Sequence, residues 1–166
     1  MGFEGVPKPT QAGPPLMIGG GSPRVLGIAG READIVSLNF DNRSGVLGPD
    51  SVGSGSAEQT ARKIDWIRAG AEQRTDGRTF DDLELEIAAY FTVVTDERDA
   101  ALAAMAGRMG APPEALAEHP HTLIGSVDDI CEQLEARRVA YGISYVTIAG
   151  RAAPGFAPVV DRLAGK

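Results

Sequence analysis

The chain has 166 residues, of which 43% are hydrophobic, and its formal net charge is −7. This length and composition predict one domain with a sizeable hydrophobic core. The acidic balance argues against nucleic acid as a partner, because phosphate backbones are bound through clustered Lys and Arg side chains. The single cysteine, Cys131, cannot form an internal disulfide and is expected to be a buried thiol.

The sequence has no apolar run long enough to span a membrane, and its N-terminus lacks a basic stretch followed by an apolar one. A membrane partner and a secretory signal are therefore not expected. We accordingly expect a cytoplasmic protein.

The stretch PPLMIGGGSPR, residues 14–24, predicts a strand, a tight turn and the start of a helix. Residues 16–18 are apolar, as in a buried parallel strand, and the three glycines that follow allow a turn without a Cβ penalty. Ser22 is a suitable N-cap and Pro23 suits the first helical position. The free N–H groups of the turn and helix can then point together at an anion, which predicts a phosphate-binding turn.

Two other interpretations of the glycine triplet stay open. It can be only a tight connection between a strand and a helix. A dinucleotide fingerprint starting at Gly19 fits poorly, because its third glycine would fall on Arg24, although Asp41 lies at a suitable distance for a ribose contact. A phosphate-bearing flavin-type cofactor fits the turn as well.

The rest of the chain alternates between expected strands and helices. Ser56 with Gln59, and Ser126 with Asp129, form capping boxes at two helix starts, and Gly142 indicates a helix end. About four strands alternating with helices predict an α/β fold with a parallel sheet. The expected strands cover residues 16–18, 33–40, 83–94 and 143–149. The expected helices cover residues 23–29, where Gly30 can end the helix, and residues 56–73, 95–109, 113–118, 126–141 and 156–163. The long connection at residues 41–55 is expected to form a mobile rim of the site.

Two pairs of residues are further candidates for chemistry. Glu84 and Glu86 share one side of the third expected strand, but glutamates at the entrance of a strand are more often solvated than catalytic. His119 and His121 could bind a metal ion, yet no nearby cysteine or acidic cluster completes a site. Ordinary loop histidines and no metal are therefore expected.

Three separated blocks resemble the C-terminal half of the luciferase-like flavin monooxygenases, and most closely their branch that uses the deazaflavin coenzyme F420. The blocks are PTQAGPPLMIGGGSPRVLGIAGREADIVSLN, then KIDWIRAGAEQR followed by LELEI, and LIGSVDDICEQLEARRVAYGISYVTI. The resemblance extends from about Val6 to Leu163. Because members of that family are TIM (β/α)8 barrels, it implies that residues 1–166 form one partial barrel domain, with strands equivalent to barrel strands five to eight.

The resemblance also implies site residues. The phosphate-binding turn of the family matches Gly19, Gly20 and Gly21, with Ser22 beside it, and the implied cofactor is coenzyme F420 or, alternatively, FMN. The exit of barrel strand six, which lines the cofactor and substrate pocket in the family, matches Asn39 and its two neighbours. The implied activity is that of an oxidoreductase or monooxygenase acting on a small-molecule substrate.

No catalytic residue can be named, because in that family the groups that hold the flavin ring and handle the proton come largely from the first four strands. A complete barrel needs roughly 250 residues, and four parallel strands leave two unpaired edges. We therefore expect a chain that supplies the phosphate-binding half, is inactive alone, and pairs with a copy of itself or with an N-terminal half barrel, unless it is a truncated product. The alternative is a non-catalytic half barrel that serves as a binding or assembly module.

Overall fold

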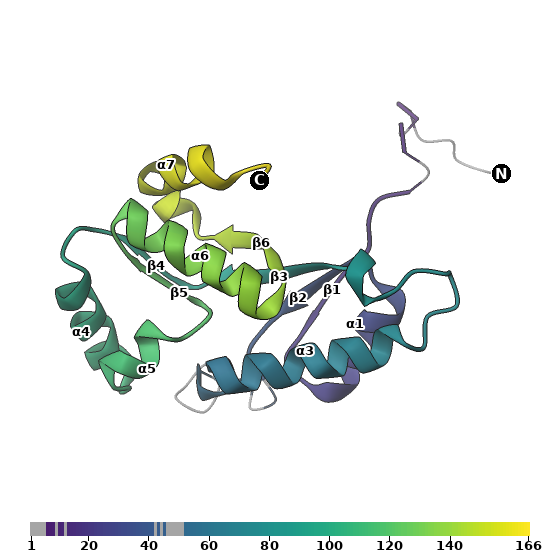
Figure 1. Ribbon diagram of the computed structural model, residues 1–166, viewed down its shortest axis with the longest axis horizontal. Helices are drawn as coiled ribbons and strands as arrows, with labels where there is room; N and C mark the ends of the chain where they lie inside the picture. The colour runs from purple at the N-terminus through teal and green to yellow at the C-terminus, as the bar shows by residue number, and fades with distance from the viewer. Residues whose placement is uncertain (1–5, 9, 12, 42, 44, 46–51) are drawn as a thin grey trace.

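The computed structural model describes residues 6–8, 10–11, 13–41, 43, 45 and 52–166. The fold is built around a four-stranded sheet in the order β1-β2-β3-β6, in which all neighbouring strands are parallel (Figure 1). A separate parallel ladder joins β4 to β5. The strands are β1 (Met17–Gly20), β2 (Ile35–Leu38), β3 (Glu84–Ala89), β4 (Phe91–Val94), β5 (Thr122–Gly125) and β6 (Ile143–Ile148).

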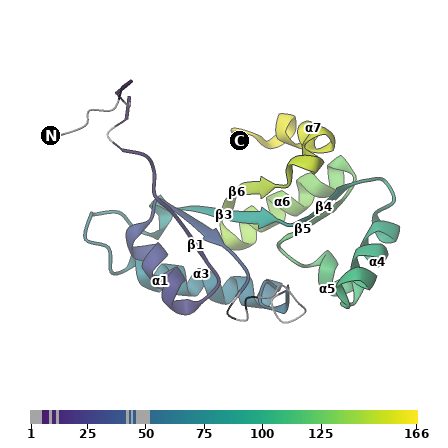
Figure 2. The same cartoon turned by 180° about the vertical axis from the view of Figure 1, so that it is seen from behind.

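The helices follow the strands in alternation, as an α/β fold requires. In Figure 1 helix α6 lies in front of the main sheet, whereas Figure 2, the view from behind, shows β1 and β3 on the viewer's side of α6. No helix in the described ranges is long and apolar enough to cross a membrane. The helices are α1 (Pro23–Glu32), α3 (Ala57–Ala71), α4 (Arg98–Met109), α5 (Pro113–Ala117), α6 (Val127–Tyr141) and α7 (Ala153–Leu163), with 3-10 turns η1 (Phe80–Asp82) and η2 (Gly150–Ala152).

The main core lies between the sheet and the helices α1 and α3, and a separate cluster lies between α6 and α7. Side chains alternate between the two faces of a strand, so Leu85 and Ile87 of β3 point to this core together with Val36 and Leu38 of β2. The residues between them, such as Ser37, face the opposite side of the sheet. Leu26, Ala29, Ala33, Ile64, Ile67 and Ile143 complete the buried cluster.

Several predicted helix signals are confirmed. Asp129 N–H donates to Ser126 Oγ at 3.2 Å, and Ser126 N–H donates to the Asp129 carboxylate at 2.8 Å, which is the predicted capping box. Ser56 Oγ accepts from the N–H of Gln59 at 3.3 Å at the start of α3. Gly142 ends α6 in the left-handed conformation, with φ of 75°.

Several expected boundaries are wrong, and two helices begin elsewhere than expected: α4 at Arg98 instead of residue 95, and α7 at Ala153 instead of residue 156. The third expected strand, residues 83–94, is broken at Tyr90, so its first part joins the main sheet and its second part pairs with β5. Strand β5 was not expected, because a four-residue buried run carries no period that distinguishes strand from helix. Gly30 does not end α1, which continues to Glu32. The expected mobile rim at residues 41–55 lies largely outside the described residues.

An ionic network fastens the amino edge of the sheet. Asp34 accepts from the N–H of Leu16 at 2.6 Å and is paired with Arg78. These two hydrogen bonds lower the pKa of Asp34. Arg74 donates to the carbonyl groups of Gly30 and Ala33, both at 2.9 Å, at the C-terminal end of α1. This edge is therefore a structural one, opposite the edge that carries the glycine turn.

Candidate functional site

The glycine turn lies at the carboxyl edge of the sheet. Gly19 and Gly20 belong to β1, where they are paired in register with Ser37 and Leu38 of β2, and Gly21 follows before the start of α1. The N–H of Asn39 donates to the carbonyl oxygen of Gly20 at 2.9 Å. The structure thus brings together the glycines and Asn39, which are 18 or more residues apart in the sequence.

Close packing explains the three glycines better than an unusual backbone does. A Cβ on Gly21 would lie 2.7 Å from the backbone nitrogen of Asp41, and a Cβ on Gly19 would lie 2.8 Å from Asn39 Nδ2. A Cβ on Gly20 would lie 2.9 Å from Cβ of Val25. None of the three glycines has a positive φ. The predicted reason for them, a turn that avoids a Cβ penalty, is therefore replaced by close packing. They allow β1 and α1 to approach the exit of β2.

The first turn of α1 carries backbone donors without partners. The N–H groups of Ser22, Arg24 and Val25 donate to no backbone acceptor within the described part of the chain, as is usual for the start of a helix. Ser22 has an extended backbone, and its side chain makes no capping hydrogen bond. This turn contains no acidic residue and includes the exposed Arg24. Its positive end is therefore free to accept an anion.

Asn39 joins the ends of three elements. Its Nδ2 donates to Ser37 Oγ at 3.2 Å, and its Oδ1 accepts from the hydroxyl of Tyr90 at 2.8 Å. Its main-chain oxygen accepts from Lys63 Nζ at 2.6 Å. Asn39 therefore holds Tyr90, at the break between β3 and β4, against the exit of β2.

Lys63 is a buried cation that the sequence interpretation missed. It lies on α3 with 2% of its surface exposed, and its Nζ donates to the carbonyl oxygens of Asn39 and Ser54 at 2.6 and 2.7 Å. Burial lowers the pKa of Lys63 to about 8, and the nearby charge of Asp41 opposes this shift. The one sign of its burial in the sequence was the position of Lys63 next to Ile64, beside the apolar stripe of α3.

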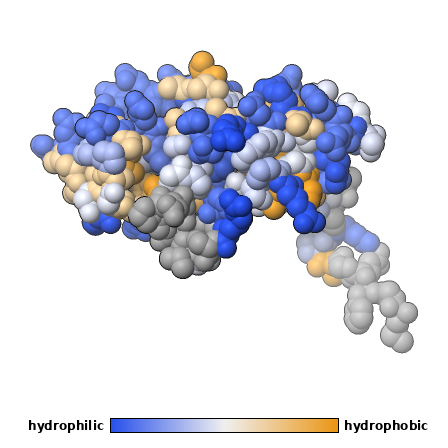
Figure 3. Space-filling model, turned by 90° about the horizontal axis from the view of Figure 1, so that it is seen from below, coloured by the Kyte–Doolittle hydropathy of each residue, from blue (hydrophilic) through white to orange (hydrophobic). Residues whose placement is uncertain are grey.

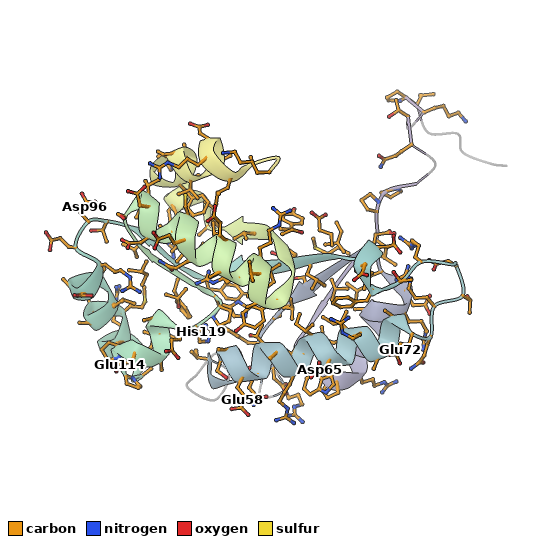
Figure 4. The ribbon with its side chains drawn as sticks, viewed as in Figure 1. Glu58, Asp65, Glu72, Asp96, Glu114 and His119 are labelled. Atoms are coloured by element: carbon orange, nitrogen blue, oxygen red, sulfur yellow. The ribbon has the colours of Figure 1, made fainter. Side chains whose placement is uncertain are left out.

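His119 and His121 are buried, and their ring nitrogens bind the backbone. His119 Nε2–H donates to the carbonyl oxygen of Val52 at 2.9 Å, and its Nδ1 accepts from the N–H of His121 at 3.2 Å. His121 Nδ1–H donates to the carbonyl oxygen of Ala88 at 2.8 Å. Figure 4 shows His119 in the interior, whereas Glu58 lies near the start of α3. Within the described ranges no group of three or more His, Cys, Asp or Glu residues could hold a metal ion.

The two histidines belong to an aromatic cluster at this edge. The ring of His121 is stacked on Tyr90 with centroids 5.4 Å apart, and lies 4.5 Å from Phe40. Burial lowers the pKa of His121 to about 3 and also lowers the pKa of His119, so both rings are neutral at neutral pH. The cluster packs against Phe40 and Tyr90, the residues that follow the C-terminal ends of β2 and β3.

Glu86 departs from its expected state. Glu84 is exposed, as predicted, but Glu86 is only 3% exposed, so the prediction of a solvated pair is wrong for this residue. Glu86 lies in register with Ser37 of β2 and Tyr145 of β6. Its side chain therefore lies on the face of the sheet opposite the helix-side core. The alternation of side chains along the strand predicted which face of the sheet Glu86 occupies. Its burial could not be predicted in this way, because it depends on how neighbouring strands cover that face.

A hollow of about 240 Å³ lies elsewhere, between α6, β6 and α7. Val146 of β6 borders it, and this residue is on the helix side of the sheet, away from Glu86. Hydrophilic side chains cover much of the face drawn in Figure 3, and hydrophobic ones gather in separate patches. Ser22 and Asn39, which the sequence singled out, lie instead at the carboxyl edge, which is where parallel α/β barrels place their sites, whereas Glu84 begins β3 at the amino edge.

Comparison with models of known families gives no match, and comparison with curated proteins gives none either. Solved structures do match the fold. EDTA monooxygenase from Chelativorans sp. BNC1 has a TM-score of 0.59 and 16% identity, covering 95% of this chain and 46% of that chain. Riboflavin lyase, solved with modified FMN and riboflavin, has a TM-score of 0.58 and 14% identity, covering 97% of this chain and 46% of that chain.

A third structure is the coenzyme F420-dependent tetrahydromethanopterin reductase from Methanopyrus kandleri, with a TM-score of 0.54 and 17% identity, covering 83% of this chain and 45% of that chain. The chain thus spans about half the length of the solved structures it matches. Its parallel strands and helices, together with these matches, confirm the predicted fold, one half of a TIM barrel.

Proposed function

We propose that this chain, which has the fold of half a luciferase-like barrel, binds the phosphate of a flavin-type cofactor and contributes that half of an oxidoreductase site. The observation that carries the proposal is the start of α1, where unpartnered N–H groups, Ser22 and Arg24 meet at the carboxyl edge of the sheet. When bound, a reduced flavin or deazaflavin supplies a hydride or activates oxygen. The chain's own contribution is to bind and orient the cofactor's phosphate.

The physical fit of the turn to a phosphate rests on three features. The helix dipole and the free N–H groups of Ser22, Arg24 and Val25 favour an anion at this end of α1. The close packing that Gly19, Gly20 and Gly21 allow brings the start of α1 to the same edge as the exit of β2. Asn39 acts indirectly, because its amide is already bonded to Ser37 and Tyr90.

Coenzyme F420 is the first choice of cofactor and FMN the second, because the sequence blocks resemble the F420 branch of the family. Both compounds carry a phosphate that the same turn can bind. Riboflavin lyase, which matches the fold, was solved with modified FMN, and the matching reductase is F420-dependent. We further propose a cytoplasmic enzyme domain over residues 1–166 that acts on a small-molecule substrate.

The catalytic groups would come from a partner half. Strands β1 and β6 end the four-stranded sheet, so each has one edge without a neighbour in that sheet. A second half barrel, from another copy of the chain or from an N-terminal half, would close these edges into eight strands. One observation favours the alternative of a non-catalytic module: packing alone accounts for all three glycines.

Substitutions at Ser22 test the phosphate site without disturbing the turn. Asp and Asn are equally good N-caps, so Ser22→Asp and Ser22→Asn should fold equally well. The carboxylate of Ser22→Asp would repel a phosphate, and we expect its Kd for F420 or FMN to exceed that of Ser22→Asn by at least about tenfold. Fluorescence titration of the 166-residue chain measures both values.

Glycine substitutions are unsuitable for this purpose, since an added Cβ on Gly20 would collide with Val25. Equal cofactor affinities of Ser22→Asp and Ser22→Asn would contradict the phosphate site. If the chain alone binds neither cofactor, the titration is repeated with an added N-terminal half barrel. Absence of binding there too would favour the non-catalytic module.

A further inference from the structure

The open face of the sheet holds one buried acidic group that has no partner. Glu86 is only 3% exposed, yet its carboxylate makes no hydrogen bond and no ion pair with any described residue. Fully buried side-chain atoms without a partner are confined, in the described part of the chain, to Arg98, Thr122 and Arg137. The carboxylate oxygens of Glu86 therefore keep the small contact with solvent that the residue has.

The position of Glu86 connects it to the proposed site. A row of four paired positions crosses the sheet on this face, from Gly19 through Ser37 and Glu86 to Tyr145. Two strand spacings, about 10 Å, separate Glu86 from β1, which leads into the glycine turn. Tyr90 comes four residues after Glu86, and the alternation of side chains places both on the same face. Burial together with the charge of Glu86 raises the pKa of the Tyr90 phenol.

A side chain as buried as Glu86 without a protein partner is unusual for a carboxylate. Removing a carboxylate from water without a replacement hydrogen bond is unfavourable, so such groups are nearly always paired in folded proteins. Where they are unpaired, they are concentrated at functional sites, and a bound ligand can supply the missing donor. Glu84, two residues earlier on the same face, shows the ordinary state, because it is exposed to solvent.

We propose that Glu86 binds the ring system of the cofactor by accepting a hydrogen bond from a ring N–H group. This inference rests on the proposed function and deepens it, because it assigns a second contact to the same ligand. The phosphate is held at the start of α1, and the ring reaches the open face of β3. Glu86 thereby gains from the ligand the hydrogen-bond donor that the described residues do not supply.

The test compares Glu86→Gln with the matched control Glu84→Gln, using FMN and riboflavin as probes. Both probes carry the same ring, and only FMN carries the phosphate. Glu86→Gln is expected to weaken both probes by the same factor, about tenfold, because it replaces a charged acceptor by a neutral one. Glu84→Gln should leave both affinities unchanged.

Thermal unfolding of the unliganded chain supplies a readout that a structural role would not give. Glu86→Gln is expected to leave Tm unchanged or higher, because no described residue pairs with the carboxylate that it replaces, and Glu84→Gln should also leave Tm unchanged. A lower Tm for Glu86→Gln would show that the carboxylate supports the fold, and would overturn the inference whether or not a cofactor binds.

The two proposals fail in different ways. If Ser22→Asp weakens FMN but Glu86→Gln binds both probes like wild type, the ring contact is wrong and the phosphate site stands. If Glu86→Gln weakens both probes but Ser22→Asp and Ser22→Asn bind FMN equally, the ring contact stands and the phosphate site is wrong. If neither probe nor coenzyme F420 binds wild type, with or without an N-terminal half, both proposals are wrong.

Discussion

Replacing Gly30 by alanine is expected to destabilise the protein by about 3 kcal/mol or more. Gly30 lies in α1 where the helix crosses α3, and an added Cβ would lie within 3.0 Å of the carbonyl oxygen of Ile67 and 3.1 Å from the nitrogen of Ala71. Both atoms belong to the backbone of α3. The clash can therefore be relieved only by separating the two helices, which would open the main core.

The same helix offers a matched control at Gly27. A Cβ on Gly27 would meet nothing within 4 Å, so Gly27→Ala should stabilise the protein by up to about 1 kcal/mol through helix propensity alone. Urea unfolding followed by circular dichroism measures both variants. Equal stabilities of Gly27→Ala and Gly30→Ala would show that the helices do not cross as closely as described.

Acid is expected to destabilise the protein through His121. The pKa of this ring is about 3 in the folded protein and 6.5 in the unfolded chain, so protonation below pH 6.5 favours the unfolded state. The contribution of the neutral ring is fully present above pH 6.5 and is lost as the pH falls toward 3. The shift corresponds to a loss of about 4 kcal/mol over that range, and His119 acts in the same direction.

His121→Asn tests this expectation, because an amide N–H can replace the Nδ1–H donor to Ala88 and does not titrate. Urea unfolding at pH 7.0 and at pH 4.5 gives the loss of stability on acidification for each protein. That loss should be about 2 kcal/mol smaller in His121→Asn than in wild type. The same loss in both proteins would show that His121 is not buried as a neutral ring.

Local sequence rules predicted the framework of the fold because they act through nearest neighbours. The capping box of Ser126 and Asp129 marked the start of α6, and Gly142 marked its end, because both signals depend on backbone groups within one turn. Alternation of strands and helices predicted the parallel sheet. Strand β5 could not be found in this way, because its pairing with β4 depends on a break at Tyr90 that no local rule requires.

The composition of the site was harder to predict, because burial depends on contacts between distant segments. Lys63 is charged and is next to the apolar stripe of α3, yet it is buried, and the carbonyl groups of Asn39 and Ser54 accept its hydrogen bonds. Glu86 reads as a solvated residue until neighbouring strands cover it. In the sequence Gly30 looks like a residue that ends a helix. In the structure a glycine is required at this position because α3 crosses α1 there.

The ratio of the riboflavin and FMN dissociation constants of the wild-type protein tests the central claim most directly, because the two ligands differ only by the phosphate. The measurement is a fluorescence titration of the chain, with an N-terminal half barrel present if the chain alone does not bind. A phosphate held at the start of α1 predicts that FMN binds at least about tenfold more tightly than riboflavin. Equal affinities for the two ligands would contradict a phosphate site at this turn.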